Sequence, residues 1–426
     1  MLTAIVGINW GDEGKGRMVD LLSADYDVIC RYQGGNNAGH TVINDKGKFI
    51  LNLLPSGILR ENTVNVMGNG MVIDLEHLCG EMSRLIEKGI KIVPDNLKIS
   101  QNAVICFPYH VQQDILEEER LVDKKYGSTR RGIAPVYSDR YMKKGVRMGD
   151  LLFPDTLPGK VADILEWKNL ILSGYGAPAF SLKDTLDWLE KFGKPLLPFI
   201  CDTSTFLDRA VKNGKRVMFE AQLGALRDID FGIYPYTSSS QTLASYGPTG
   251  AGIPGAKLNL TVGIMKAYSS CVGEGPFTAE MFGEEAEKLR AAGGEYGAAT
   301  GRPRRVGAFD VPASRYGVRV QGADCLALTK LDVLSYLDKI PVCEAYEING
   351  EKTTEFPTGD RLLLAKPIIQ YLPGFKTDIS RCRKPSDLPP EALSYIKTLE
   401  AAVGCKIKYV SVGAEREDYI QLSTVN

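Results

Sequence analysis

The sequence lacks the features that mark several large classes of protein. It has 426 residues but no run of about 18 consecutive apolar residues, so it offers no helix that would span a membrane. The formal net charge of −1 provides no overall attraction to nucleic acid or to an acidic membrane. Nine cysteines are scattered without a C-x-x-C pair, which favours reduced thiols over a disulfide framework or a zinc site. These absences predict a cytoplasmic protein that holds any anionic ligand through a local basic cluster, with neither nucleic acid nor membrane as a partner.

Apolar runs of strand length alternate with helical patterns along most of the chain. Buried strands are expected at residues 3–8, 28–31, 64–67, 216–220, 260–267, 325–329, 340–345 and 407–411. Helical periodicity is found at residues 15–23, 74–88, 109–120, 182–192, 205–213, 279–292, 332–339 and 390–403. This alternation predicts an α/β fold with a mostly parallel central sheet flanked by helices. No repeat or linker interrupts the pattern, so residues 1–426 are expected to form one large domain.

Two segments show neither periodicity. Residues 124–149 are rich in lysine and arginine, and residues 234–254 are rich in serine, threonine, glycine and proline. Surface loops without a function would explain both compositions. Long ordered loops in compact domains are often functional, however, so both segments are expected to be long ligand-binding loops.

Residues 7–22, GINWGDEGKGRMVDLL, resemble a phosphate-binding loop between a strand and a helix. Such a turn directs backbone N–H groups and a helix N-terminus at a phosphate. Lysine is electrostatically unfavoured at a helix N-terminus, so Lys15 indicates an anion close by. The Walker pattern is incomplete, because Gly16 stands where a hydroxyl would bind Mg²⁺. Asp12 could supply the missing oxygen ligand or act as a base, although a helix-capping acid and a solvated lysine would also explain these two residues.

Histidine is rare in this chain, with three residues at 40, 77 and 110. His77 and His110 fall in helical patterns and are expected to be structural. His40 ends the stretch QGGNNAGHT at residues 33–41, where glycines and amides would allow close approach to a ligand. An imidazole in that place could act as an acid or donate to a developing negative charge.

Two later stretches could bind a nucleotide or a carboxylate. Residues 298–305, AATGRPRR, place three arginines around a glycine and a proline. Arginine clusters recognise carboxylate and phosphate bidentately, although a solvated basic turn has the same composition. Residues 328–333, LTKLDV, follow an expected strand and resemble the guanine-reading element of GTP-binding proteins. Asp332 could accept hydrogen bonds from two guanine N–H groups, and the stem of Lys330 could lie along the base.

Taken together, these blocks resemble the adenylosuccinate synthetase family. The matching blocks span almost the whole chain in the family's order: WGDEGKG at 10–16, RYQGGNNAGHT at 31–41, LPSGILREN at 54–62, RGIAPVYSD at 131–139, DIDFGIYPY at 228–236, GIMKAYS at 263–269, VGEGPF at 272–277, TGRPRR at 300–305, LTKLDVL at 328–334 and SVGAERED at 411–418. The resemblance implies a P-loop-related α/β fold. It also implies an enzyme of purine biosynthesis that joins IMP and L-aspartate at the expense of GTP, with Mg²⁺, and that works as a homodimer.

The resemblance also implies a role for individual residues. Asp12 would remove the N1 proton of IMP, His40 would act on the 6-oxygen as a general acid, and Asp12 and the Gly39 carbonyl would hold Mg²⁺. GTP contacts are implied for Gly11, Asp12, Glu13, Gly14, Lys15, Gly16, Arg17, Gly39, His40, Thr41, Arg304, Lys330, Leu331, Asp332, Ser411, Val412 and Gly413. IMP contacts are implied for Asp12, Glu13, Gly14, Lys15, Asn37, Ala38, Gly39, His40, Thr129, Lys143, Gln222, Ser238 and Arg302. Aspartate contacts are implied for Ala299, Thr300, Gly301, Arg302, Pro303, Arg304 and Arg305.

The chain departs from the family pattern at several expected contacts. Lys143 replaces the arginine that crosses to the partner's nucleotide, and it keeps the charge without the bidentate fork. In E-A-Q-L-G at 220–224, Leu223 stands where an IMP-contacting amide belongs and Gln222 lies one place early. Ser238 replaces threonine, and Ala299 lacks a hydroxyl. A paralogue that aminates another purine nucleotide, or uses another amine, therefore stays open, as does a non-catalytic guanine-nucleotide-binding regulator.

Overall fold

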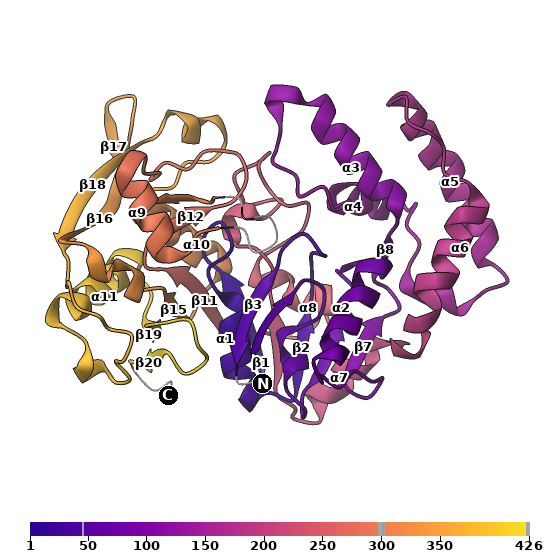
Figure 1. The fold of residues 1–426 in the computed structure, drawn as a ribbon, viewed down its shortest axis with the longest axis horizontal. Helices are drawn as coiled ribbons and strands as arrows, with labels where there is room; N and C mark the ends of the chain where they lie inside the picture. Colours follow the sequence, from indigo (N-terminus) through magenta and orange to yellow (C-terminus); the bar gives the residue numbers. More distant parts are fainter. Residues whose placement is uncertain (45–46, 297–300, 302, 423–426) are drawn as a thin grey trace.

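A ten-stranded sheet runs through the centre of the molecule (Figure 1). The computed structural model describes residues 1–44, 47–296, 301 and 303–422. In sheet order the strands are β20 (Tyr419–Gln421), β19 (Ile407–Ser411), β15 (Cys325–Thr329), β11 (Leu260–Lys266), β1 (Leu2–Gly7), β10 (Val217–Glu220), β2 (Val28–Arg31), β5 (Val64–Met67), β7 (Leu97–Ser100) and β9 (Ile200–Cys201). Every neighbouring pair is parallel except β19 and β20, which are antiparallel. The mostly parallel sheet expected from the sequence is confirmed.

The central strand β1 is buried on both faces, which explains its continuous apolar run. Ala4 and Val6 pack into one apolar cluster, while Ile5 points to the opposite face. On that opposite face Ile5 meets Met18 and Val19 of the first helix. Because side chains alternate along β1, Ile5 faces α1 and holds this helix against the sheet next to the loop that joins β1 to α1.

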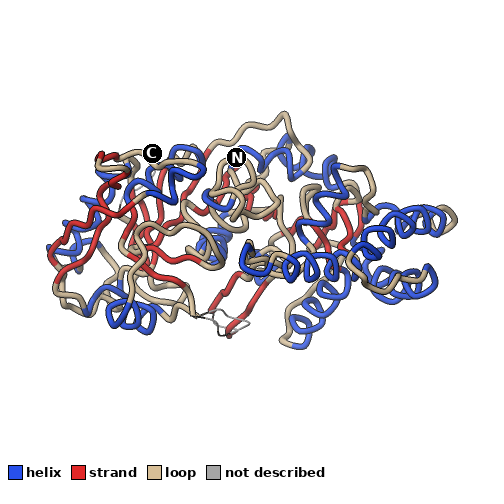
Figure 2. Tube along the Cα trace, turned by 90° about the horizontal axis from the view of Figure 1, so that it is seen from above, coloured by secondary structure: helices blue, strands red, loops and turns tan. Residues whose placement is uncertain are grey.

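Helices cover the sheet and also form one end of the molecule (Figure 1). They are α1 (Lys15–Leu22), α2 (Leu75–Glu87), α3 (Pro108–Arg120), α4 (Ile133–Tyr141), α5 (Leu157–Gly174), α6 (Leu182–Gly193), α7 (Thr203–Lys212), α8 (Gly247–Ala251), α9 (Gly283–Gly293), α10 (Val311–Gln321) and α11 (Pro390–Val403). Helices α3 to α6 lie together at one end of the long axis, and a second view shows the same helical end far from the C-terminus (Figures 1 and 2). No helix in the described residues is both long and apolar enough to cross a membrane.

Smaller sheets lie beside the main one. Strands β14 (Phe309–Asp310), β16 (Lys339–Ile348), β17 (Glu351–Thr353) and β18 (Lys366–Pro373) form the sheet at the other end of the molecule. Three further pairs are β3 (His40–Asn44) with β4 (Gly47–Leu51), β6 (Val72–Asp74) with β8 (Val104–Cys106), and β12 (Ser269–Cys271) with β13 (Arg305–Gly307). The β3–β4 hairpin is antiparallel and begins at His40, so it carries that residue back to the site.

The structure corrects several local predictions. The segments expected to be long loops contain helices, α4 within 124–149 and α8 within 234–254. The helix expected at 332–339 is a short 3-10 helix, Asp332–Tyr336, after which β16 begins. Helix α10 was not expected. Eight of its 11 residues are buried, so its polar side consists of Arg315 and Arg319 alone and gives only a weak helical period.

Candidate active site

The candidate site lies at the carboxyl ends of the central parallel strands. Strand β1 pairs with β10 on one side and β11 on the other, although the strand that follows it in sequence, β2, lies beyond β10. The connection from β1 to β2 runs toward one edge of the sheet, and the connection from β10 to β11 runs toward the other edge. In open α/β sheets ligands bind in the crevice at such a switch point. The ends of β10 and β19 carry Glu220 and Ser411. The segments that follow β1 and β15 carry the glycine-rich loop and Lys330 with Asp332.

The loop predicted to bind phosphate, residues 8–15, is held together by the carboxylate of its own Glu13. The Glu13 carboxylate accepts hydrogen bonds from the N–H groups of Asn9 at 3.1 Å and Gly11 at 2.8 Å. Its other oxygen lies 2.6 Å from the ammonium group of Lys15. Both charged side chains are buried. Glu13 thus satisfies the loop donors and the lysine that an anionic phosphate group would otherwise attract.

Gly16 is explained by the close approach of a histidine. A Cβ atom at residue 16 would lie 2.5 Å from the Cβ atom of His40, which is too close for any side chain. The hydroxyl of a Walker loop therefore could not be accommodated here. The glycine that departs from the Walker pattern allows His40 to reach this loop.

His40 is buried and oriented by a carboxylate. Its Nδ1 atom lies 2.5 Å from Oε1 of Glu220, at the end of β10, and Glu220 also accepts hydrogen bonds from the N–H and hydroxyl of Ser56. Among the described residues no partner is found for the Nε2 atom of His40. Burial lowers the pKa of His40, and the bond to Glu220 opposes that shift. The arrangement holds one ring nitrogen fixed and leaves the other available.

Asp12 stands at the mouth of the loop in a strained conformation. Its φ of 59° is uncommon for a residue with a side chain. The carboxylate is 29% exposed and lies 3.0 Å from the guanidinium group of Arg304. Burial alone would lower the pKa of Arg304, but the charges of Asp12 and Glu295 outweigh it and raise that pKa. The loop containing residues 303–305 is therefore held against the phosphate loop by an ion pair.

The stretch that is predicted to read guanine, residues 328–333, also reaches this site. The hydroxyl of Thr329 donates to the carbonyl of Glu13 at 2.7 Å, which joins the end of β15 to the phosphate loop. Lys330 has a φ of 59° and Leu331 is buried. Burial raises the pKa of Asp332, whose buried Oδ1 atom has no partner in the described part of the chain. An unpaired buried carboxylate oxygen is costly, so it fits a ligand that donates an N–H group to it.

Arg17 connects helix α1 to the loop that follows β19. Its guanidinium group donates to the hydroxyl of Ser411 and to the carbonyls of Gly413 at 2.5 Å and Asp418 at 2.8 Å. The main chain of Ser411 in turn accepts a hydrogen bond from Leu331 at 3.2 Å. The two predicted guanine-side segments, around 330–332 and 411–413, therefore form one unit with the phosphate helix.

Gln222 lies under the glycine-rich loop. Its side-chain amide donates to the carbonyls of Gly35 at 3.0 Å and Ala38 at 3.3 Å, and its oxygen accepts from the N–H of Gly35 at 3.1 Å. The side chain is fully buried. Leu223 next to it has a φ of 63° and lies against Gly11. These contacts give Gln222 a place in supporting the loop, and its direct contact with a nucleotide stays a prediction.

The segment with Thr129 is held by two acids that the sequence did not single out. Asp114 of α3 accepts a hydrogen bond from the hydroxyl of Ser128 at 2.6 Å. Glu118, one turn further, accepts from the N–H of Gly127 at 2.9 Å. Their spacing of four residues on one helix face was the available signal. The segment is thus fixed just before α4 begins.

The remaining predicted residues differ in how well they are placed. Exposed positions are Gly39, Thr41, Thr129, Lys143, Gly301 and Pro303. Asn37 is half-buried, and Ser238 shares a hydrogen bond of 2.9 Å with Ser240. Arg305 pairs with Glu280 at 2.9 Å. Ala299, Thr300 and Arg302 lie outside the described residues.

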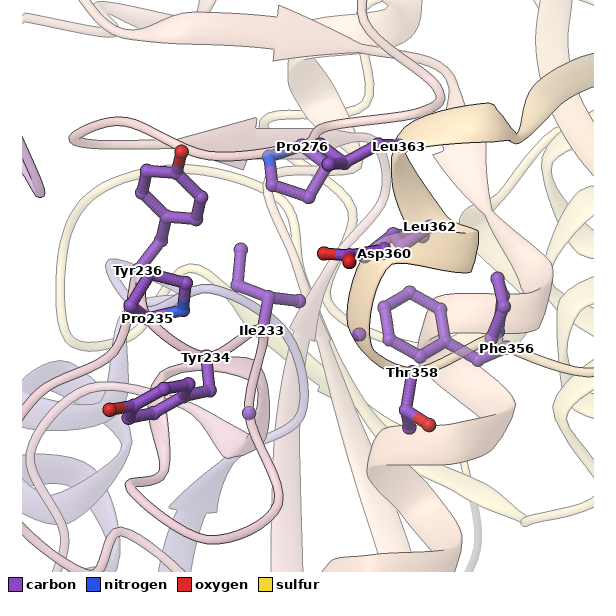
Figure 3. A pocket seen from close by; sticks show the side chains of 13 residues that line it. Ile233, Tyr234, Pro235, Tyr236, Pro276, Phe356, Thr358, Asp360, Leu362 and Leu363 are labelled. Carbon is purple, nitrogen blue, oxygen red and sulfur yellow. The ribbon is translucent and has the colours of Figure 1, made fainter. Parts of the chain in front are cut away.

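Figure 3 shows a separate small cavity of about 100 Å³. Tyr234 and Tyr236 form one wall, and Phe356 and Leu362 stand opposite them. None of the predicted site residues lines it. The cavity therefore has no part in the arrangement described above.

Known proteins resemble this chain over almost its whole length. The family model of adenylosuccinate synthetase matches residues 4–420. Adenylosuccinate synthetase of Caldanaerobacter subterraneus subsp. tengcongensis is 43% identical, covering 99% of both chains, and that of Pelotomaculum thermopropionicum is 44% identical, covering 98% of this chain and 97% of the relative. The structure of fully ligated adenylosuccinate synthetase from Plasmodium falciparum has a TM-score of 0.93 and 35% identity, covering 99% of both chains. The chain therefore belongs to the adenylosuccinate synthetase family, a family of ligases.

Proposed function

We propose that this protein joins IMP and L-aspartate at the expense of GTP, forming adenylosuccinate, GDP and phosphate in the cytoplasm. The observation that carries the proposal is the pair of His40 and Glu220. A buried imidazole with one nitrogen held at 2.5 Å and the other without a described partner, beside a phosphate loop, fits proton transfer. A guanine-nucleotide-binding regulator would have no use for it. The predicted aspartate contacts at residues 299–305 would have no function in such a regulator either.

The proposed chemistry has two steps. Asp12 removes the N1 proton of IMP, and the resulting 6-oxyanion attacks the γ-phosphorus of GTP, so the bond from that phosphorus to the bridging oxygen breaks and GDP leaves. The aspartate amine then attacks C6 of the 6-phosphoryl-IMP intermediate. The C6–O bond breaks, phosphate leaves with that oxygen, and the amine loses a proton. His40 stabilises the 6-oxygen in the first step and donates to it as it leaves.

Mg²⁺ fits the residues of this loop. The Asp12 carboxylate and the Gly39 carbonyl are hard oxygen donors, and both are accessible. In the part of the chain that the structure describes, no cluster of three His, Cys, Asp or Glu ligands occurs. A cation held by few protein ligands and mainly by phosphate oxygens suits this donor set. When bound, Mg²⁺ would offset charge on the phosphate groups.

We propose that Lys15 and the loop amides hold phosphate groups of the nucleotides. For this, Glu13 must release the N–H groups of Asn9 and Gly11 and the ammonium of Lys15. A phosphate group carries more negative charge and more acceptor oxygens than one carboxylate, so it competes well for these donors. Glu13 would thus keep the loop ordered when no nucleotide is bound.

Asp332 is proposed to read guanine together with Lys330. Asp332→Asn should reduce the preference for GTP over ATP by about tenfold to a hundredfold, because an amide cannot accept both guanine N–H groups. The ratio of kcat/KM for the two nucleotides measures this preference. The KM for IMP should stay unchanged and serves as the internal control. Unchanged discrimination would contradict guanine reading at this residue.

A homodimer is proposed in which Lys143 reaches the partner's IMP. Lys143 has a φ of 62° and projects at the end of α4 beside Tyr141 and Met142, whose side chains are 70% and 49% exposed. Such neighbouring apolar groups fit an interface. Lys143→Ala should raise the KM for IMP about tenfold. A mixture of Lys143→Ala subunits with Asp12→Asn subunits should regain activity, since hybrid dimers contain one intact site; no recovery in mixed, exchanged dimers would argue against the crossing.

A product assay tests the whole proposal. Purified protein with GTP, Mg²⁺, IMP and aspartate should yield adenylosuccinate, and its absence despite GTP binding would refute the proposal. One observation favours a second candidate acceptor: the polar atoms of Gln222 are engaged within the protein, and Leu223 offers no amide. Replacing IMP by other purine nucleotides, or aspartate by other amines, decides between the two. Turnover with a replacement alone would favour the paralogue.

A further inference from the structure

Glu295 is a fully buried carboxylate that no part of the proposed mechanism uses. It follows the end of α9. One of its oxygens accepts hydrogen bonds from the ammonium of Lys266 at 2.8 Å and from the hydroxyl of Tyr268 at 2.5 Å. Its other oxygen accepts from the guanidinium of Arg304 at 2.9 Å. A carboxylate buried in this way is stable only with such partners, so the cluster is built around its charge.

The same carboxylate lies between two functional segments. The ammonium of Lys330, in the guanine-reading stretch, is 3.6 Å from it. Lys330 also donates to the carbonyl of Gly293, the last residue of α9. On the other side, Arg304 bridges Glu295 and Asp12 with distances of 2.9 and 3.0 Å. Glu295 therefore contacts Lys330 directly and is linked to Asp12, the proposed base, through Arg304.

We propose that Glu295 is a positioning residue that fixes Lys330 for guanine binding and Arg304 against Asp12 at the same time. The proposal rests on the function proposed above for Lys330 and Asp12. Three cations, from Lys266, Arg304 and Lys330, surround this one acid. Without its charge they repel one another and lose their shared acceptor, so both segments lose their positions together.

Glu295→Gln tests the proposal with little change in volume. We expect the dissociation constant for GTP, measured by calorimetry, to rise about tenfold and kcat to fall about tenfold, because charge-assisted bonds at two partners are weakened. The KM for IMP should stay within twofold of the wild-type value. A purely structural loss would lower the thermal midpoint and weaken all substrates alike. Wild-type values for both GTP affinity and kcat would overturn the proposal.

A double-mutant cycle locates the effect. If Glu295 acts through Lys330, the loss of GTP affinity caused by Glu295→Gln should largely disappear when Lys330→Met is already present. Additive losses would overturn this link. Glu284→Gln is the matched control, since Glu284 also pairs with a lysine, Lys288 at 2.6 Å, but on the exposed face of α9. It should leave GTP affinity and kcat unchanged.

Tyr268→Phe covers the case in which Glu295→Gln does not fold. This variant keeps the buried charge and removes one hydrogen bond of 2.5 Å to it. A rise of about threefold in the GTP dissociation constant is expected, and no change would overturn the proposal. The GTP measurement does not depend on turnover. Failure of the wild-type product assay would therefore refute the proposed function without deciding the role of Glu295.

Discussion

Asp12→Asn is expected to lower kcat by about 10³-fold or more while leaving GTP affinity within a few-fold of wild type, because a positioned base contributes on that scale. The amide cannot accept the N1 proton. It also offers a weaker oxygen ligand to Mg²⁺. Single-turnover formation of GDP in the presence of IMP measures the loss directly.

Asparagine is the informative substitution at this position. Asp12 has a φ of 59°, and asparagine adopts the left-handed region more readily than alanine does. Arg304 keeps its hydrogen bond to Glu295 when Asp12 changes, so the neighbouring loop retains a support. Asp338→Asn is a suitable control, because Asp338 also pairs with a cation, Lys376, but is 79% exposed. A rate near that of the wild type for Asp12→Asn would refute its role as base.

His40→Asn is expected to reduce phosphoryl transfer by about 10²-fold to 10⁴-fold, with GTP binding largely intact. The substitution removes the ring nitrogen that would face the 6-oxygen. The shorter amide keeps a polar group near Glu220. Glu220→Gln should cause a smaller loss, since the imidazole remains but its orienting charge is gone. Equal rates for wild type and His40→Asn would exclude His40 from the chemistry.

The proposed role of His40 also predicts proton uptake. Burial lowers the pKa of His40 in the free protein, so the imidazole is neutral above that pKa with its Nδ1–H directed at Glu220. Donation from Nε2 requires the protonated ring. Bound phosphate groups bring negative charge and raise the pKa again, so binding near neutral pH should take up a proton. Calorimetry in buffers of different ionisation enthalpy measures this, and uptake that persists in His40→Asn would contradict the assignment.

Local sequence patterns were enough for the elements whose neighbours in sequence are also their neighbours in space. The apolar run of β1, the glycine turn and Lys15 on α1 are contiguous, so strand, turn and helix could be predicted together. The stretch from Lys330 to Asp332 directly follows the buried strand β15 for the same reason. The match of many ordered blocks also predicted the family, which the comparisons confirm.

Helix prediction failed where burial hides the period. Helix α10 is buried along most of its length, so its polar side is reduced to Arg315 and Arg319. Helix α4 lies within a segment whose many cations resemble a solvated loop, although Ile133 and Val136 face the core. In both cases tertiary packing outweighs the local signal.

The sequence by itself determined most of the buried strands, the glycine-rich turn between β1 and α1, and the family. It also supplied the predictions that this turn binds phosphate and that residues 330–332 read guanine. Only the tertiary structure decided how distant residues combine. It placed Glu220 against His40, 180 residues away in sequence, and showed that Gly16 is glycine because His40 packs on it. It turned Gln222 inward and set Glu295 between Lys330 and Arg304. The physical reason is that a parallel sheet collects the carboxyl ends of strands from all parts of the chain at one edge, and no local pattern records which side chains meet there.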